Sequence, residues 1–351
     1  MRAKRFLFCI VGVGAGNTTR NLAILEELQR QGRCEILIAA QGRALELLRE
    51  RYKTIGLQTI KYSDSGNLTP WDLVRSNLSF PTRFLENRAR LTEVMKDFRP
   101  DLVVADSDFY CLQPARKLGL RLASINNAAV VVEMIRREGG LPANCRFSYH
   151  AIEKTDYLLQ RRYPHRVLCP TVKRLPGLGR KFVQIPPMVR PEIQPLAERG
   201  EEIVVLTGGS GMDTANIDLR SLEGMAVRTV GTHLEKVPSG TRQIGFSLDV
   251  MEHLRHAKVL VVQGGFSSIS EAVALRVPTV VLPVANQAEQ WSNGKAIESL
   301  GMGVSVAAPQ AGEAVQYVLR QLDQYWRVAQ GLRVPTDGHR HAARALWRWA
   351  Q

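Results

Sequence analysis

Short apolar runs alternate with amphipathic segments along the chain, and this alternation predicts most of its secondary structure. In the first half, the apolar runs predict strands over Phe6–Val11, Glu35–Ala40 and Leu102–Ala105. Helical periodicity lies between them, over Thr18–Gln31, Ala44–Tyr52 and Thr82–Phe98. Repeated strand–helix alternation is typical of an α/β protein with a parallel, doubly wound sheet, whose ligand loops follow the carboxyl ends of the strands.

A proline-rich segment divides the chain into two halves. Its four prolines, which block both helix and central strand and favour a semi-rigid connector, are Pro186, Pro187, Pro191 and Pro195. The alternation resumes beyond them with an apolar run at Ile203–Leu206. We therefore predict two Rossmann-like domains facing a cleft, over residues 1–185 and 201–335, with a linker over residues 186–200 and a final helix over residues 336–351.

Length and composition agree with a two-domain globular protein. At 351 residues the chain exceeds the size at which a single core usually keeps growing. No apolar run approaches the roughly 20 residues needed to span a bilayer. The five cysteines are scattered without the spacing of a metal site, which favours buried, reduced thiols in a cytoplasmic protein.

The net charge of +14 is carried by the first half of the chain. Lys and Arg outnumber Asp and Glu by 15 in residues 1–190, whereas the acidic residues are in excess by 1 in residues 191–351. Part of the excess clusters between Arg161 and Lys181, among apolar residues. Such a surface suits an anionic membrane, with the protein peripheral on its inner face; a merely solvated basic surface is the alternative. Nucleic acid is not expected, because no nucleic-acid-binding module is visible.

The stretch Val259–Val304 carries the most specific chemistry. An apolar run over Val259–Val262 leads into Gly264-Gly265, a Ser-rich turn and an amphipathic segment that opens near Ser270-Glu271. A turn that leads into a helix presents free backbone N–H groups to an anion.

A polar loop follows the next apolar run, Val277–Pro283. The loop carries Asn286, Gln287, Glu289, Gln290 and Asn293. Two neighbouring strand ends therefore bring carboxylate and amide side chains together, and such groups can bind a ribose and a sugar while the turn holds a diphosphate. The alternative for Glu271 is that it merely caps a helix.

This stretch resembles the donor-binding half of GT-B glycosyltransferases, in particular the group that includes the lipid-linked UDP-N-acetylglucosamine transferase of peptidoglycan synthesis. The family pattern is GG-x-x-[ST]-x-x-E-A, a Pro-rich strand, an EQ-x-x-N loop and a Gly pair. It is met here by Gly264, Gly265, Ser268, Glu271, Ala272, Pro278, Pro283, Glu289, Gln290, Asn293, Gly301 and Gly303. The core of the linker, PPMVR, resembles the interdomain hinge of the same proteins.

The resemblance implies roles for individual residues on the donor side. Glu271 would hold the ribose hydroxyls, and the turn of Gly264, Gly265, Ser267 and Ser268 would approach the pyrophosphate. Donor-sugar contacts would come from Gln287, Glu289 and Gln290. A second glycine turn, Gly208, Gly209 and Ser210, would face the diphosphate, and the backbone around Phe246 would contact the base. The final helix would cross back to the first domain.

Glycines also follow the first predicted strand, at Gly12, Gly14 and Gly16. They make only half of a dinucleotide-binding fingerprint, because the third glycine is misplaced and no acidic residue follows the second strand. They resemble instead the GT-B acceptor-side loop G-x-G-x-G-H-x-T-R, which Thr19 and Arg20 also match. The acceptor-side set that this implies is Gly14, Gly16, Thr18, Thr19 and Asn127. Asn17 stands where the family has histidine.

The asparagine at position 17 leaves the catalytic base to another residue, because an amide cannot accept a proton at physiological pH. Asp106 and Asp108 follow the Leu102–Ala105 strand, and two carboxylates so close together raise one pKa and sharpen a base. The alternative is a helix cap and a solvated side chain. Asp106-Ser107-Asp108 also spells a D-x-D metal motif, but it lies in the acceptor half, and no bound metal or other cofactor is expected.

The expectation from the sequence is therefore a metal-independent, inverting GT-B glycosyltransferase that uses a nucleotide diphosphate donor, which the resemblance implies is a UDP-sugar, with the nucleotide-sugar as its partner. Two alternatives stay open: a nucleotide-sugar hydrolase on the same fold, and a non-catalytic nucleotide-sugar-binding partner of another transferase. Oligomeric state is not predicted.

Overall fold

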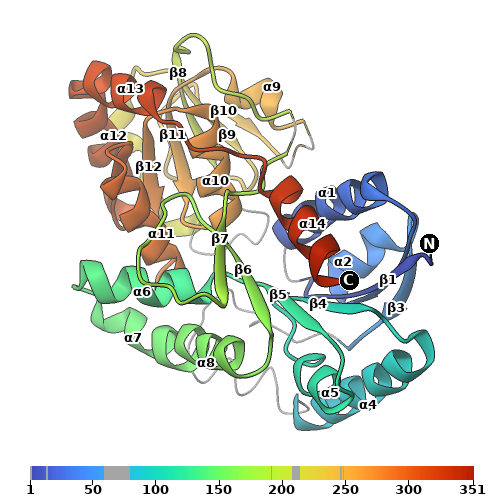
Figure 1. The fold of residues 1–351 in the computed structure, drawn as a ribbon. Coiled ribbons are helices and arrows are strands. Elements are labelled where there is room, and N and C mark those ends of the chain that lie inside the picture. The colour runs from blue at the N-terminus through green and yellow to red at the C-terminus, as the bar shows by residue number, and fades with distance from the viewer. Residues whose placement is uncertain are drawn as a thin grey trace. The chain divides into compact units, whose positions relative to one another are not determined.

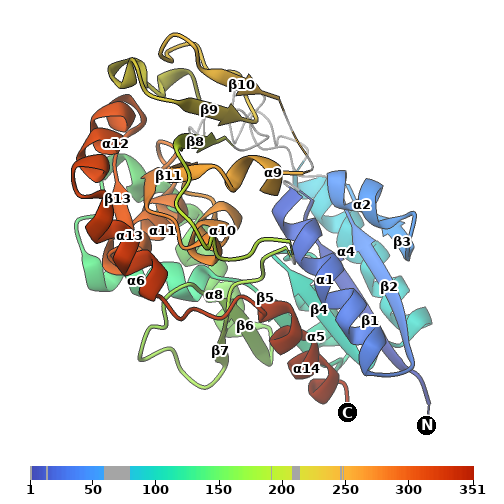
Figure 2. The same cartoon turned by 90° about the horizontal axis from the view of Figure 1, so that it is seen from above.

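The chain forms two compact units, each built on a parallel β-sheet. The computed structural model describes residues 2–12, 15–58, 80–190, 192–207, 214–245, 247 and 249–351. Unit 1 comprises residues 1–130, 154–188 and 337–351, and unit 2 comprises residues 131–153 and 189–336. In each unit, helices cover both faces of the sheet (Figure 1 and Figure 2). The prediction of an α/β protein with two Rossmann-like domains is confirmed.

The sheet of unit 1 has seven parallel strands in the order β3-β2-β1-β4-β5-β6-β7. They are β1 (Lys4–Ile10), β2 (Cys34–Ala40), β3 (Lys53–Gly56), β4 (Leu102–Asp106), β5 (Leu122–Ile125), β6 (Arg166–Pro170) and β7 (Phe182–Ile185). The central strands are apolar runs because helices bury both of their faces. The strands predicted from the sequence are found here with shifts of one or two residues at their ends.

The helices of unit 1 connect successive strands of its sheet, except α14, which is the last helix of the chain. They are α1 (Ala15–Gln31), α2 (Gly42–Leu48), α4 (Phe80–Phe98), α5 (Leu112–Lys117), α8 (Lys154–Arg162) and α14 (Gly338–Trp349). The C-terminal helix α14 packs on α1, and the Trp347 ring stacks on Phe6 of β1 with ring centroids 6.1 Å apart. Gly32 makes the close approach possible, because a Cβ there would lie 2.9 Å from the Trp347 ring.

Unit 2 has a six-stranded parallel sheet in the order β10-β9-β8-β11-β12-β13. The strands are β8 (Glu202–Leu206), β9 (Val227–Val230), β10 (Arg242–Ile244), β11 (Ala257–Gln263), β12 (Thr279–Leu282) and β13 (Gly303–Ser305). The helices that follow them are α9 (Met251–Leu254), α10 (Phe266–Leu275), α11 (Ala288–Ser299), α12 (Ala311–Arg320) and α13 (Leu322–Gly331). Short 3-10 turns lie at Thr214–Asn216, Arg220–Leu222 and Ala308–Gln310.

Residues 131–153 precede the proline-rich segment in sequence but pack within unit 2. This segment holds most of α6 (Ala128–Glu138), a 3-10 turn (Ala143–Cys145), α7 (Arg146–Ser148) and a π-helical turn (Tyr149–Glu153). Its apolar side chains cluster with Ala288 of α11, and the Ala288 N–H donates to Ser148 Oγ at 3.1 Å. Burial of this apolar face explains why the segment leaves the unit that precedes it in sequence.

All five cysteines are free, and four of them are buried. Among the described residues, no helix combines the length and the apolar character that a membrane span requires.

Candidate functional site

The glycine turn of unit 2 lies at the carboxyl end of β11 and leads directly into α10. Gly265 is the N-cap, and the first helical hydrogen bond runs from the Ile269 N–H to the Gly265 carbonyl at 3.1 Å. The N–H groups of Phe266, Ser267 and Ser268 therefore belong to the first turn, which offers its N–H groups to an anion. The helix begins at Phe266, so the predicted opening near Ser270-Glu271 is wrong by one turn.

Glycine is required at position 264 because the start of α11 packs against it. A Cβ at Gly264 would lie 2.7 Å from the Gln290 carbonyl oxygen. Asn293 Nδ2 donates to the Gly264 carbonyl at 2.9 Å, which holds the turn against α11. The glycine turn is thus a fixed backbone cradle.

Asn286 and Gln287 lie in the predicted polar loop, whereas Glu289, Gln290 and Asn293 of the same prediction lie within α11. Gln287 is the N-cap of the helix, and Glu289 lies in its first turn. Gln290 is almost buried; its Oε1 accepts from the Val284 N–H at 3.0 Å and its Nε2 donates to Gln287 Oε1 at 2.8 Å. The Gln290 amide therefore shapes the loop after β12 in this structure, and a sugar would have to compete with these bonds.

Glu271 lies in the second turn of α10 and forms an ion pair that the sequence pattern did not reveal. Arg190, the last residue of the PPMVR segment, places its Nε 3.0 Å and its Nη2 2.9 Å from Glu271 Oε1. The Glu271 side chain is 13% exposed and the Arg190 side chain is 21% exposed. Burial raises the pKa of Glu271, and the Arg190 guanidinium opposes that rise. A carboxylate and a guanidinium thus lie together, and each can hydrogen-bond a polar ligand.

Several predicted site residues lie outside the described part of the chain. They are Gly14 of the acceptor-side loop and Gly208, Gly209, Ser210 and Phe246 of the donor side. Gly16 is part of α1.

Asp106 closes β4 at the carboxyl edge of the unit 1 sheet and is bound by α1. It is 0% exposed. Arg20 pairs with both of its oxygens, with Nε 2.8 Å from Oδ2, and Asn21 Nδ2 also donates to Oδ2. Asp106 therefore fastens α1 to the end of β4, and no oxygen of this carboxylate faces solvent.

The other acceptor-side residues lie around the same edge of the sheet. Asn17 Nδ2 donates to the Val11 carbonyl at 3.2 Å, and the Asn17 carbonyl accepts from Asn21 Nδ2 at 2.7 Å. Thr18 is buried, whereas Thr19 is exposed. Asn127 is half-buried just before α6, and its carbonyl accepts from the Val130 N–H at 2.8 Å. The structure therefore brings Asn17 and Asp106 to one place through α1.

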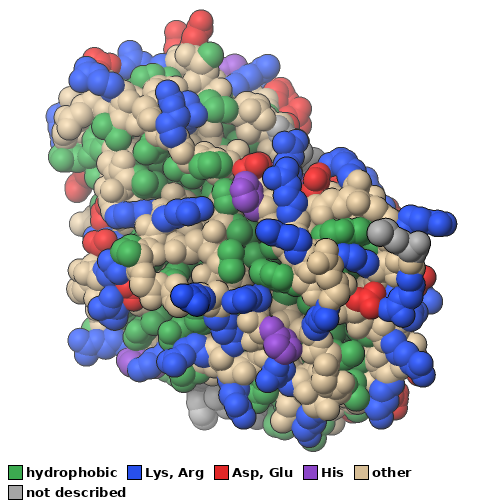
Figure 3. Space-filling view, viewed as in Figure 1, with side chains coloured by type: hydrophobic (Ala, Val, Ile, Leu, Met, Phe, Trp, Pro, Cys, Tyr) green, Lys and Arg blue, Asp and Glu red, His purple; other side chains and the backbone are tan. Residues whose placement is uncertain are grey.

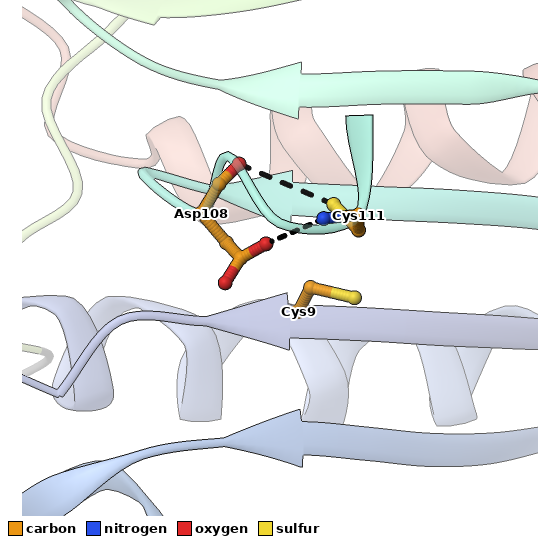
Figure 4. A group of neighbouring side chains, drawn as sticks. All are labelled: Cys9, Asp108 and Cys111. Carbon is orange, nitrogen blue, oxygen red and sulfur yellow. Dashed lines mark hydrogen bonds between the residues drawn. The ribbon is translucent and has the colours of Figure 1, made fainter. Parts of the chain in front are cut away.

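Asp108 points into the interior beside two thiols (Figure 4). Its Oδ1 accepts from the Cys111 N–H at 3.0 Å, and its Oδ2 is buried with no partner among the described residues. Burial raises the pKa of this carboxyl to about 6, and the Cys111 N–H opposes the rise. One potential ligand atom from each of Cys9, Asp108 and Cys111 lies within 4.8 Å of the others. This is the group among the described residues that could hold a thiophilic ion.

Sequence comparison places the chain among glycosyltransferases. Residues 4–322 match the model of the family described as Glycosyl transferase family 1. A protein of Methanosarcina acetivorans described as an uncharacterized glycosyltransferase is 25% identical over 91% of this chain and 89% of its own length. The UDP-N-acetylglucosamine--N-acetylmuramyl-(pentapeptide) pyrophosphoryl-undecaprenol N-acetylglucosamine transferase of Prochlorococcus marinus is 25% identical over 82% of this chain and 67% of its own length.

Solved structures of glycosyltransferases share the fold. Acinetobacter baumannii MurG matches with a TM-score of 0.68 and 17% identity, covering 98% of this chain and 99% of the other. The glycotransferase of kitacinnamycin matches with a TM-score of 0.68 and 18% identity over 100% of both chains. At these identities the likeness shows the fold, which is the GT-B fold expected from the sequence.

Proposed function

Because this chain belongs to glycosyl transferase family 1, we propose that it moves a sugar from a UDP-sugar to an acceptor, with inversion and without a bound metal ion. The family supports the activity class. The UDP donor is supported by the relative from Prochlorococcus marinus, whose name specifies UDP-N-acetylglucosamine.

The observation that carries the donor proposal is the arrangement of Glu271 and Arg190 at α10. The first turn of α10 offers backbone N–H groups, and the second turn carries a mostly buried carboxylate paired with a guanidinium. A nucleoside diphosphate presents the complementary groups, namely ribose hydroxyls that donate to a carboxylate and phosphate oxygens that accept from amides and guanidinium. The fixed cradle at Gly264 keeps the amides in place for the diphosphate.

We further propose that donor binding exchanges the partners of this ion pair. Ribose hydroxyls would take over Glu271, and Arg190 would turn to the diphosphate. The positive end of the α10 dipole and the Arg190 guanidinium would then neutralise the negative charge of the diphosphate, which a divalent ion neutralises in other enzymes. This exchange is the physical reason for proposing metal independence.

On the acceptor side, we assign the base to Asp106 rather than Asp108. Asp108 is buried beside the two thiols of the core (Figure 4). Asp106 lies beside the helix that carries Asn17, but it is occupied by Arg20 and Asn21. An acceptor hydroxyl therefore reaches Asp106 only after Arg20, which is 17% exposed, has moved away.

The test is to incubate the purified protein with UDP-sugars, with and without a lipid extract, and to follow UDP release. UDP release that occurs only with the lipid extract supports transfer to an acceptor. If UDP release is lost when the extract is replaced by a water-soluble fraction, the acceptor is a lipid. Release in water alone would instead indicate the hydrolase, and binding without release would indicate the non-catalytic partner.

Matched variants test the donor site itself. Glu271→Gln and Arg190→Gln should each weaken UDP binding by roughly tenfold or more, the scale of one charge-assisted hydrogen bond. The exposed residues Glu313 and Arg199 provide controls with the same charge changes, Glu313→Gln and Arg199→Gln. Equal UDP affinity in all four variants would remove the proposed donor site.

A further inference from the structure

Six basic residues gather at the amino ends of three neighbouring strands of the unit 1 sheet, β5, β6 and β7. They come from the ends of α5 and α8 and from the starts of the three strands: Arg116, Arg121, Arg161, His165, Arg166 and Lys181. We call this group the basic rim. Asp106 and Asn127 lie at the carboxyl ends of β4 and β5, so the rim is at the opposite edge of the sheet from the acceptor-side residues.

The basic rim has no acidic counterpart among the described residues. No rim residue takes part in an ion pair within 4.0 Å in the described ranges. The cations bond backbone carbonyls instead: Lys181 Nζ donates to the Arg161 carbonyl at 2.6 Å and Arg166 Nη1 donates to the Arg180 carbonyl at 3.0 Å. Figure 3 shows the same imbalance, with Lys and Arg side chains over β5, β6 and β7 and few Asp or Glu among them.

These cations are close enough to disfavour one another's charge. Burial lowers the pKa of His165, and the nearby Arg116 lowers it further. Burial also lowers the pKa of Lys181, with Arg116 and Arg161 acting in the same direction. Crowded like charges without a counter-charge cost free energy, and a bound anion would remove that cost.

Arg116 and the Leu122 N–H both approach the His165 ring, which while neutral can accept from only one of them. The Leu122 N–H is 3.1 Å from Nδ1 of this ring, whose other nitrogen is Nε2. Arg116 Nη1 lies 2.5 Å from that Nε2. One of these two donors is thus left without an acceptor, and an anionic oxygen beside the ring would give Arg116 one.

An apolar pocket opens next to these donors. It has a volume of about 240 Å³, and its apolar wall consists of Leu102, Leu122, Ala123 and the Trp349 ring. Arg121, His165 and Arg166 line its polar side. A cavity of about 150 Å³ is enough for a benzene ring, so this pocket has room for one ring or a short alkyl chain.

We propose that this pocket binds a small phosphate monoester whose apolar group is a single ring or a short chain. The phosphate would lie on the basic rim and the apolar group against Trp349. Phosphate is favoured over a carboxylate because several guanidinium groups surround the site, and guanidinium groups bind phosphate oxygens in pairs. The proposal does not rest on the proposed transfer reaction, since none of its residues belongs to the donor or acceptor sets.

The full chain is tested by calorimetry with phenyl phosphate, inorganic phosphate and phenol. Phenyl phosphate should bind most tightly, inorganic phosphate more weakly and phenol not measurably. The double variant Arg116→Gln/Arg166→Gln should weaken phenyl phosphate binding by about tenfold for each cation removed. The control Arg90→Gln/Arg174→Gln removes the same charge from exposed positions of unit 1 and should change the affinity less than twofold.

The wild-type chain alone can refute the proposal, whatever the folding of the variants. Failure of phenyl phosphate to bind at millimolar concentration, or equal binding of phenol, would overturn it. Sedimentation with phosphatidylglycerol vesicles is the second arm. Vesicle binding that is lost in the Arg116→Gln/Arg166→Gln variant, together with no phenyl phosphate binding, would replace the small-molecule site by a membrane surface. UDP affinity should be the same in all of these variants.

Discussion

The buried carboxyl of Asp108 should make the stability of unit 1 depend on pH. Asp108 is 1% exposed, and burial raises its pKa from 3.8 to about 6. Below pH 3.8 the carboxyl is protonated in both the folded and the unfolded chain. Between pH 3.8 and 6 only the unfolded chain releases the proton, so the free energy of unfolding falls as pH rises. Above pH 6 the folded carboxyl also ionises and the loss levels off.

The size of this loss follows from the two pKa values. Each pKa unit corresponds to 1.36 kcal/mol, so the shift corresponds to about 3 kcal/mol. Asp108→Asn removes the titration while keeping an oxygen for the Cys111 N–H. The free energy of unfolding of the wild type, relative to this variant, should therefore drop by about 2.4 kcal/mol between pH 4 and pH 7, because part of the full loss has already occurred at pH 4.

Urea unfolding at a series of pH values measures this difference. The exposed Asp97 of α4 provides the matched control, and Asp97→Asn should give a profile parallel to the wild type. Parallel profiles for the wild type and Asp108→Asn would refute the reasoning, because Asp108 would then ionise as easily in the folded chain as in the unfolded one.

Three further outcomes are expected. Asp106→Asn leaves Arg20 without its buried partner and should destabilise the protein by about 3–5 kcal/mol. Thermal melting measures this loss, with Asp97→Asn as the control, and an unchanged melting temperature for Asp106→Asn would contradict the prediction. Gly264→Ala places a Cβ 2.7 Å from the Gln290 carbonyl oxygen and should lower the free energy of unfolding by about 1–3 kcal/mol. Gly265→Ala places a Cβ with no atom within 4 Å and should lower it less. A lower melting temperature for Gly265→Ala than for Gly264→Ala would be inconsistent with the fixed backbone cradle. Treatment with a strong chelator should leave UDP release unchanged, and a loss restored by zinc would point to the group of Cys9, Asp108 and Cys111.

The sequence pattern predicts the sheets well because parallel strands buried on both faces are continuous apolar runs. Phe6 to Ile10 are each 0% exposed, and such a run has no other stable environment in a globular domain. The start of α10 was harder to place. Ser267 and Ser268 favour a turn by their local hydrogen-bonding tendency, yet Ile269 and Ala272 are 0% exposed and their packing extends the helix back to Phe266.

The contacts of the candidate site were less accessible to prediction, because they join residues far apart in the chain. Arg190 and Glu271 are separated by 81 positions, and the PPMVR segment indicates a hinge without indicating which side chain its arginine meets. Arg20 and Asp106 are separated by 86 positions, so the carboxylate could be identified as chemically interesting but not as already occupied. The inclusion of residues 131–153 in unit 2 is likewise a matter of packing rather than of local pattern.

The occupancy of Asp106 leads to a last prediction, about position 17. Positions 17 and 21 lie one turn apart on the same face of α1, and Asn21 contacts Asp106. A histidine at position 17 would therefore point toward Asp106, but Arg20 holds that carboxylate and leaves it no oxygen with which to orient an imidazole.

Asn17→His alone should leave the rate of acceptor-dependent UDP release nearly unchanged, because an unoriented imidazole is a poor general base. Combining Asn17→His with Arg20→Gln frees Asp106 to orient the imidazole. The double variant should have a kcat/KM at least about tenfold higher than that of Arg20→Gln alone. This gain is smaller than the roughly 100- to 10,000-fold that a fully positioned general base contributes. Arg20→Gln is the control for the broken ion pair. A full gain in the single variant would mean that Arg20 does not compete with the ring, and no gain in either would mean that a histidine at position 17 does not act as the base.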